Sequence, residues 1–519
     1  MISEALYTAP DVPSASLRGP LERLLRVRSR ATRRRRVTCL DTFDGRIAAS
    51  GGQLLQVAEG PVTRLEWRPR ERQPRVETAL SGPAAFVWDL PAGPMATQLQ
   101  PIVDVRRLVP VVEVDLRGQL LDVVDHRSKT VARIGIDAAR ARQSTRARWH
   151  ALPTLVTLTA LRGYEDEFKR VQAIVESRPG LQRSLAGLQG LGLQAIGASP
   201  PRDLSRLDVV PMPAQRADAG VRQIHRALLG IMLGNEPGLR ADLDTEFLHD
   251  YRVALRRTRS LLAQIREVLP PAAVGHFREG FGWLGQVTGP TRDLDVLGLA
   301  LRQVPDDSGG EVAALRHDIA ARQRRVHRVM VRHLDGRRCR TLFSDWAHFL
   351  DNADQAEPEP ANASRPFGDI VCRRIWRLYR RLAERAALVS DDSPPSALHQ
   401  LRIATKKLRY LTDLTRGMHP RGEIDDVFAA LKKLQTVLGD YNDTIVHERL
   451  LLDHGRILAE THPERASALL TIGSLTEQFR ARRAPLRPRV LREVRRFCGH
   501  DMRSRFRRLF KTDAADDES

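Results

Sequence analysis

Two short segments of the chain carry histidine and basic residues at matching positions. The first, FLHDYRVALRRTRSLL, covers residues 247–262, and the second, ALHQLRIATKKLRYLT, covers residues 397–412. They align without a gap at an offset of 150 residues. Guanidinium, ammonium and imidazole groups all donate hydrogen bonds to oxyanions, and arginine also grips them bidentately. The pattern therefore indicates a duplicated unit that binds an anion.

Helical spacing gathers these side chains onto one face of each segment. Each residue turns an α-helix by about 100°, so positions 0, +3, +7 and +10 fall within an arc of about 80°. The predicted binding residues on this face are His249, Arg252, Arg256 and Arg259 in the first segment and His399, Arg402, Lys406 and Arg409 in the second. Arg257 and Lys407 flank the two faces and complete the predicted set.

A row of like charges along a helix repels itself unless anions lie beside it. If the duplication places the two helices together, the rows form a basic cleft that fits a chain of phosphates. The alternative is that the cations pair with acidic residues inside the bundle, or form a solvated face. Acidic candidates for such pairing include Asp293, Asp295, Asp443 and Glu448.

The two histidines have several possible roles: metal ligand, proton carrier, donor to an anion, or packing residue. Neither copy has HExxH spacing or an adjacent acid at a ligand offset on the basic face, and the neighbouring cations oppose metal binding. We therefore expect no metal and no catalytic residue here, and favour donation to an anion. A protonated imidazole would strengthen such binding at acid pH.

A second pair of stretches extends the same register. WLGQVTGPTRDLDV (283–296) aligns with KLQTVLGDYNDTIV (433–446), so that Gly289 meets Gly439 and Asp293 meets Asp443. Each unit is expected to contain a basic helix, a proline-containing turn, a second helix, and a break at the glycine before the aspartate. Repeat 1 would span about 221–350 and repeat 2 about 365–510, within a helical domain over 221–510.

These segments resemble the CHAD family, which is named for conserved histidines in an α-helical domain. The resemblance covers about residues 212–510 and rests on LHDYRVALRRTRS with GPTRDLDV, and on LHQLRIATKKLRYL with LGDYNDTIV. It implies an all-α bundle of two pseudo-two-fold repeats whose basic surface binds inorganic polyphosphate, often at polyphosphate granules. It assigns that role to the ten residues of the two basic segments and implies no cofactor.

Further cations near the second segment are weaker candidates for the same surface. VCRRIWRLYRR places several arginines on one face of a predicted helix, and two lysines follow the second segment in sequence. These additional candidates are Arg373, Arg377, Arg380, Lys432 and Lys433.

The remainder of the chain divides into segments that differ in composition and apolar periodicity. Residues 1–36 contain several arginines, including Arg33–Arg36, and predict a solvated basic arm. Residues 37–196 alternate short apolar segments with Gly, Pro and Asp and end in helical patterns, which predicts an antiparallel β-rich domain. Residues 197–220 predict a linker and 511–519 an acidic tail. The fold class is therefore α+β multidomain.

The β-rich part resembles the CYTH family, the triphosphate tunnel fold, through CLDTFDGRIAASGGQLLQV at 39–57. Members of that family use a Glu-x-Glu-x-Lys strand to hold metal and triphosphate. RVRSRATRRRRV stands before Asp41 instead, and Gln56 replaces an expected basic residue. The resemblance thus implies a degenerate domain without catalysis. A metal-dependent triphosphate or polyphosphate hydrolase remains the alternative function.

The composition of the chain restricts the classes of binding partner that we expect. The formal net charge of +21 and pI of about 10.8 favour anionic ligands. Aromatic residues make up only 5% and no DNA-reading motif occurs, so nucleic acid is not the expected partner despite the basic segment near the C-terminus. The sequence shows no signal peptide, no apolar span and no paired cysteines, which predicts a cytoplasmic protein with no membrane span.

Overall fold

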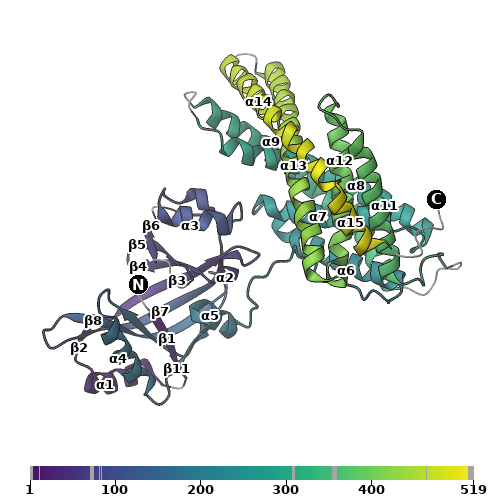
Figure 1. Cartoon of the computed structure of the whole chain (residues 1–519). Coiled ribbons are helices and arrows are strands. Elements are labelled where there is room, and N and C mark those ends of the chain that lie inside the picture. The colour runs from purple at the N-terminus through teal and green to yellow at the C-terminus, as the bar shows by residue number, and fades with distance from the viewer. Residues whose placement is uncertain are drawn as a thin grey trace. The chain divides into compact units, whose positions relative to one another are not determined.

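A computed structural model describes residues 4–511 except for 11, 71–74, 81, 83, 307–309, 353–358 and 463–464. The predicted acidic tail therefore lies outside the described residues, apart from Lys511. The chain divides into two compact units, Met1–Leu204 and Ser205–Ser519. The helices and strands carry the labels of Figure 1.

The N-terminal unit is an antiparallel sheet with eleven strands among the described residues. The strands are β1 (Glu4–Ala9), β2 (Val27–Ser29), β3 (Arg33–Asp41), β4 (Gln53–Glu59), β5 (Val62–Arg68), β6 (Val76–Ala79), β7 (Val109–Val124), β8 (Thr130–Arg142), β9 (His150–Ala151), β10 (Thr154–Ala160) and β11 (Gln182–Arg183). Their order is β11-β1-β10-β8-β7-β3-β4-β5-β6, while β2 pairs with β7 and β9 pairs with β8.

The first strand corrects the prediction of a solvated arm over residues 1–36. β1 pairs with β10 from Glu4 opposite Thr159 to Ala9 opposite Thr154, and is buried along most of its length. β2 and the start of β3 also lie within residues 1–36. The β-rich domain therefore begins no later than residue 4, rather than at residue 37, and β1 is its first described strand.

The arginine run is part of this sheet because its side chains alternate between two faces. On one face, Arg35 pairs with Asp137 at 2.8 Å, and Arg33 lies beside it. On the other face, Arg34 pairs with Asp115 at 2.8 Å and Arg36 pairs with Glu113. Four consecutive charges fit a central strand because carboxylates of β7 and β8 lie opposite them.

Short helices cover the sheet and close its apolar cores. They are α1 (Ser14–Leu24), α2 (Arg46–Ala49), α3 (Pro94–Val103), α4 (Glu165–Glu176) and α5 (Gly187–Ile196), with a 3-10 turn at Val87–Asp89. One core joins α1 and α4 to β1, β8 and β10, and includes Leu21, Phe168 and Val156. A second joins α2 and α3 to β4 and β5, around Trp67.

The C-terminal unit is helical. Its helices are α6 (Ala217–Arg240), α7 (Thr245–Gln264), α8 (Pro271–Arg302), α9 (Glu311–Asp335), α10 (Arg337–Asp351), α11 (Phe367–Ala387), α12 (Pro395–Thr415), α13 (Arg421–Thr461), α14 (Ala466–Phe497) and α15 (His500–Phe510), with a 3-10 turn at Arg416–Met418. α6 begins within the predicted linker of 197–220.

The basic segments lie on α7 and α12, and each is followed by a longer helix, α8 or α13. α8 and α13 run without interruption through Gly289 and Gly439, so the predicted breaks at these glycines are wrong. A glycine inside a helix costs only about 1 kcal/mol relative to alanine, which tertiary packing readily offsets. The duplication itself stays a prediction from the sequence.

Apolar packing holds the long helices together. The later turns of α8 and α13 pack with α9 and α14 around Leu301, Leu451 and Phe479, and Figure 1 shows these four helices extending beyond the others. At the C-terminal end, the rings of Tyr379 on α11 and Phe506 on α15 stack with centroids 4.0 Å apart. Among the described residues, no helix is long and apolar enough to cross a bilayer.

Candidate functional site

The local sequence explains how α7 and α12 present their basic faces. Asp244 caps α7, because its carboxylate accepts hydrogen bonds from the backbone N–H groups of Glu246 and Phe247. α12 begins at Pro395, which suits the first position of a helix. Each helix buries an apolar face, such as Tyr251 and Leu255 on α7, and leaves its basic face half-buried or exposed.

On the first hairpin, the basic face of α7 lies along α8. Nη1 of Arg252 donates to the carbonyl oxygen of Gly285 at 3.0 Å and to Oγ1 of Thr288 at 2.7 Å. A Cβ atom at Gly285 would lie 2.8 Å from Nη1 of Arg259. Small residues of α8 therefore leave room for the arginine side chains of α7.

Arg292 of α8 was missed by the sequence argument and contacts the first histidine. Its Nη2 lies 2.8 Å from Nδ1 of His249, and its Nη1 donates to the carbonyl oxygen of Thr245. Because a guanidinium can only donate, Nδ1 of His249 is the acceptor. This contact therefore needs an unprotonated Nδ1 at His249.

The second hairpin repeats part of this arrangement. Nδ1 of His399 lies 2.8 Å from Oδ1 of Asn442, which is 150 residues after Arg292. Nη2 of Arg402 lies 3.9 Å from Oδ1 of Asp443. Each histidine of the basic rows therefore contacts a polar side chain 43 residues further along the chain.

The structure brings α7 and α12 together. Nε of Arg256 donates to Oη of Tyr410 on α12 at 3.3 Å. Arg257 points to another part of the same junction, where it pairs with Asp413 at 2.5 Å and is only 15% exposed. Arg257 is thus engaged in an ion pair between helices, one of the alternatives that the sequence left open.

Four cations crowd this junction: Arg252, Arg256, Arg402 and Lys406. We call them the cationic cluster. Burial, together with Arg402 and Arg256, lowers the pKa of Lys406 to about 7, while Asp443 opposes the shift. Burial and Arg256 also lower the pKa of Arg252 to about 10. Both shifts mean that positive charge is disfavoured here, so a bound anion would relieve the repulsion.

The other predicted residues differ in their exposure and in their neighbours. Arg259, His399 and Lys407 are exposed, and Arg409 is half-buried. Lys433 pairs with Glu493 of α14 at 2.7 Å, where α13 meets α14 and α15. Lys432 is exposed on α13 as well.

Of the three candidates on α11, Arg377 is the one that the structure relates to the C-terminal end of α7. Arg377 is close to Arg374, whose Nη2 donates to Oε1 of Gln264 at 2.6 Å. Arg373 and Arg380 share α11, at half-buried and exposed positions. A binding role for these three residues and for the two α13 lysines stays a prediction.

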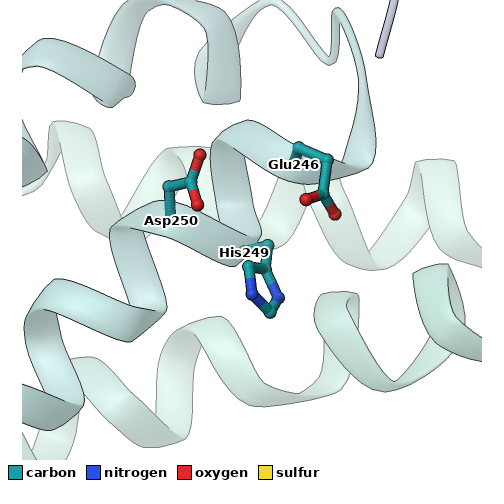
Figure 2. A group of neighbouring side chains, drawn as sticks. All are labelled: Glu246, His249 and Asp250. Carbon is teal, nitrogen blue, oxygen red and sulfur yellow. The ribbon is translucent and has the colours of Figure 1, made fainter. Parts of the chain in front are cut away.

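One group among the described residues brings three possible metal ligands together. The ligand atoms of Glu246, His249 and Asp250 lie within 4.8 Å of one another, and Figure 2 shows their arrangement on one turn of α7. Glu246 and Asp250 thus lie beside His249, although neither lies on the basic face that the sequence analysis considered. However, Nη2 of Arg292 lies 2.8 Å from His249 and 3.7 Å from Oε1 of Glu246, and a guanidinium opposes a cation at this place.

The N-terminal unit encloses a cavity of about 590 Å³ lined by arginines and carboxylates. Glu66 contacts Arg64 and Arg68, each at 3.0 Å, and also Arg75. Glu4 of β1 pairs with Arg68 at 3.1 Å. These carboxylates are bound to arginines, so the residues present do not fit the metal that the CYTH resemblance implies.

The helical unit matches a known protein family. Residues 223–452, which include both basic rows, match the family described as CHAD domain. A relative from Mycobacterium tuberculosis (strain H37Rv), an uncharacterized protein, is 27% identical over 296 residues, or 55% of this chain and 53% of the relative. The chain thus aligns with about half the length of the curated relatives it matches.

Two solved structures add the following similarities. The CHAD domain of the plant Ricinus communis aligns with 56% of this chain and 95% of that domain, at 25% identity and a TM-score of 0.47. A putative adenylyl cyclase from Hippeastrum, described as having a dominant triphosphatase activity, aligns with 39% of this chain and 99% of that protein, at 11% identity and a TM-score of 0.27.

Proposed function

The C-terminal half of the chain contains a CHAD domain, and from this premise we propose that the protein binds inorganic polyphosphate along α7 and α12. The binding residues are those of the two basic rows, with the cationic cluster at their centre. The N-terminal unit takes no part in hydrolysis in this proposal, and the protein acts as a polyphosphate-binding component of polyphosphate granules.

The observation that carries the proposal is the crowding of Arg252, Arg256, Arg402 and Lys406 at the junction of the two helices. Burial and mutual repulsion penalise the charge of Arg252 and Lys406. In contrast, Arg257 beside them is matched by Asp413. Four cations maintained at one place against their own repulsion indicate a site whose ligand supplies the missing negative charge.

Polyphosphate fits this site better than nucleic acid does. A phosphate chain is narrow and carries charge on every unit, so it can follow two helices that lie side by side. Tyr410, whose hydroxyl accepts a hydrogen bond from Arg256 of the cluster, is only 8% exposed, so its ring offers little surface on which bases can stack.

Competition binding tests this proposal. Polyphosphates of several lengths would be titrated into the full-length protein at fixed salt, against duplex and single-stranded DNA. Salt must be held constant because it weakens every phosphate contact. We expect polyphosphate to displace either DNA at equal phosphate concentration, and affinity to rise with chain length. Equal affinity for DNA would contradict the proposal.

The same protein should be assayed for phosphate release from tripolyphosphate with Mg²⁺ or Mn²⁺. We expect no release above a protein-free control. Release that depends on Glu4 or Glu66 would instead support the hydrolase alternative. In cells, a fluorescent fusion should coincide with polyphosphate granules, and a diffuse signal would contradict the localisation.

A further inference from the structure

Two aspartates lie among the cations of the proposed site. Asp293 on α8 and Asp443 on α13 are 150 residues apart and occupy matching positions in the two aligned stretches. Their side chains are 43% and 46% exposed. Binding of an anion by these cations does not by itself explain why two half-exposed carboxylates lie beside the cationic cluster.

Both aspartates are loosely paired. Oδ2 of Asp293 lies 3.9 Å from Nη2 of Arg449, and Oδ1 of Asp443 lies 3.9 Å from Nη2 of Arg402. These distances exceed those of hydrogen bonds. By comparison, Asp413 approaches Arg257 to 2.5 Å and is 22% exposed. Asp293 and Asp443 are therefore placed to face a ligand rather than to hold two helices together.

The aspartates also act on the cluster and on each other. Burial raises the pKa of Asp293, Arg252 lowers it, and Asp443 contributes a smaller increase. Asp443 in turn raises the pKa of Lys406. The two carboxylates thus lie close enough to the cationic cluster, and to one another, for their charges to be felt by any anion bound there.

We infer that Asp293 and Asp443 are specificity-determining residues, which weaken the binding of nucleic acid at this site more than the binding of a phosphate chain. This inference rests on the proposed function. A thin, flexible chain can place its phosphates against the arginines and leave the carboxylates uncovered. Duplex DNA is wide and stiff and has fixed phosphate positions, so it cannot avoid both carboxylates at once.

The test is the double variant D293N/D443N in the full-length protein. Asparagine keeps the size of the side chain and removes its charge. Dissociation constants would be measured for a long-chain polyphosphate and for a duplex DNA of similar total charge. We expect both affinities to rise, that for DNA more, so that the preference for polyphosphate falls by about tenfold or more. Each single variant should give part of this change.

A matched control separates this effect from a general change in net charge. D425N/D453N removes two half-exposed carboxylates of α13 that pair with Arg416 and Arg456. This control should leave the preference unchanged. An unchanged preference in D293N/D443N, or an equal fall in the control, would overturn the inference.

Failure of the inference is distinguishable from failure of the proposed function. If the wild-type protein binds polyphosphate through the cationic cluster and D293N/D443N keeps its preference, only the role of the aspartates is wrong. If the wild-type protein does not bind polyphosphate, the proposed function fails. Thermal melting of each variant verifies folding, and the single variants D293N and D443N serve if the double variant unfolds.

Discussion

Nε of Arg256 on α7 lies 3.3 Å from Oη of Tyr410 on α12, and this hydrogen bond joins the two basic helices at the centre of the proposed site. Tyr410 is buried, so its hydroxyl fixes the direction of the guanidinium. The sequence places these residues 154 positions apart. Their contact links a cation of the first row to the helix that carries the second row.

Replacing Tyr410 with phenylalanine should weaken polyphosphate binding without unfolding the protein. The variant keeps the buried ring and loses one hydrogen bond, whose net value is about 0.5–1.5 kcal/mol. We expect affinity to fall by about two- to tenfold. Isothermal titration calorimetry measures the change.

Tyr441→Phe is the matched control for Tyr410→Phe. The hydroxyl of Tyr441 accepts from Arg487 at 3.4 Å, and this tyrosine is also buried. Its removal should leave polyphosphate affinity unchanged. An equal loss in the two variants would show that Tyr410 does not act through Arg256.

Lys406 should make polyphosphate binding depend on pH. Its pKa is lowered to about 7 by burial, Arg402, Arg256 and Arg409, against the opposing effect of Asp443. A bound polyanion raises this pKa, so binding takes up a proton and affinity should fall as pH rises from about 6 to about 8. Lys406→Arg keeps its charge over this range and should flatten the profile. A variant with the wild-type profile would contradict this account.

The lowered pKa of Lys406 also predicts how the stability of the ligand-free protein depends on pH. The folded-state pKa of about 7 lies below the ordinary lysine value of about 10.4. Between these two values the unfolded state binds more protons, so the contribution of Lys406 makes stability increase with pH. Denaturant titrations of wild type and Lys406→Arg across this window measure the difference, and identical pH dependence would argue against a buried lysine.

Two glycines of α6 should respond oppositely to alanine. A Cβ atom at Gly238 would lie 2.3 Å from the ring of Phe247, a buried residue of α7, so the substitution overpacks the core and should cost about 1–3 kcal/mol. Gly230 has nothing within 4 Å, so alanine there should stabilise the helix by up to about 1 kcal/mol. Hydrogen exchange of peptides from α6 and α7 reports both effects. Equal exchange in the two variants would contradict this packing.

Glu66 should be essential for the stability of the N-terminal unit. Its side chain is 2% exposed and shared by three arginines, so Glu66→Gln should cost about 3 kcal/mol. Glu77 is 49% exposed, and Glu77→Gln should cost less than about 1 kcal/mol. Hydrogen exchange in β5 compares the two variants, and similar protection in both would contradict the ion-pair network.

The pH dependence of this network has a definite sign. Burial raises the pKa of Glu66, but Arg75, Arg68 and Arg64 outweigh it and hold the pKa below its ordinary value. The stabilisation is therefore present above the ordinary glutamate pKa and is lost as pH falls through the folded-state value. Protection of β5 in the wild type should decrease over this acidic range, whereas Glu66→Gln should lose that dependence.

Sequence periodicity predicts the elements that carry the site, but not all of their partners. The spacing around His249 and His399 predicts the helices α7 and α12 with one basic face each. Helical period alone cannot show that Arg257 turns to Asp413, or that Arg292 reaches His249 from the next helix. Those contacts depend on how neighbouring helices pack, which a one-dimensional pattern does not contain.

The β-sheet also contains residues whose positions local composition does not predict. Arg33–Arg36 has the composition of a solvated arm, yet these residues lie in a central strand because Asp115, Asp137 and Glu113 come from strands far along the chain. Likewise, β1 is the first strand in the chain, yet it pairs with β10 (Thr154–Ala160), which comes late in the N-terminal unit. Long-range pairing overrides local composition in both places.

The proposed polyphosphate site requires the four cations of the cationic cluster. R252A/R256A/R402A/K406A in the full-length protein should bind long-chain polyphosphate at least about 100-fold more weakly than wild type. R324A/R328A/R332A/R337A removes four exposed charges from α9 and α10 and should stay within about threefold of wild type. A cluster variant that binds as tightly as this control would contradict polyphosphate binding at the cationic cluster.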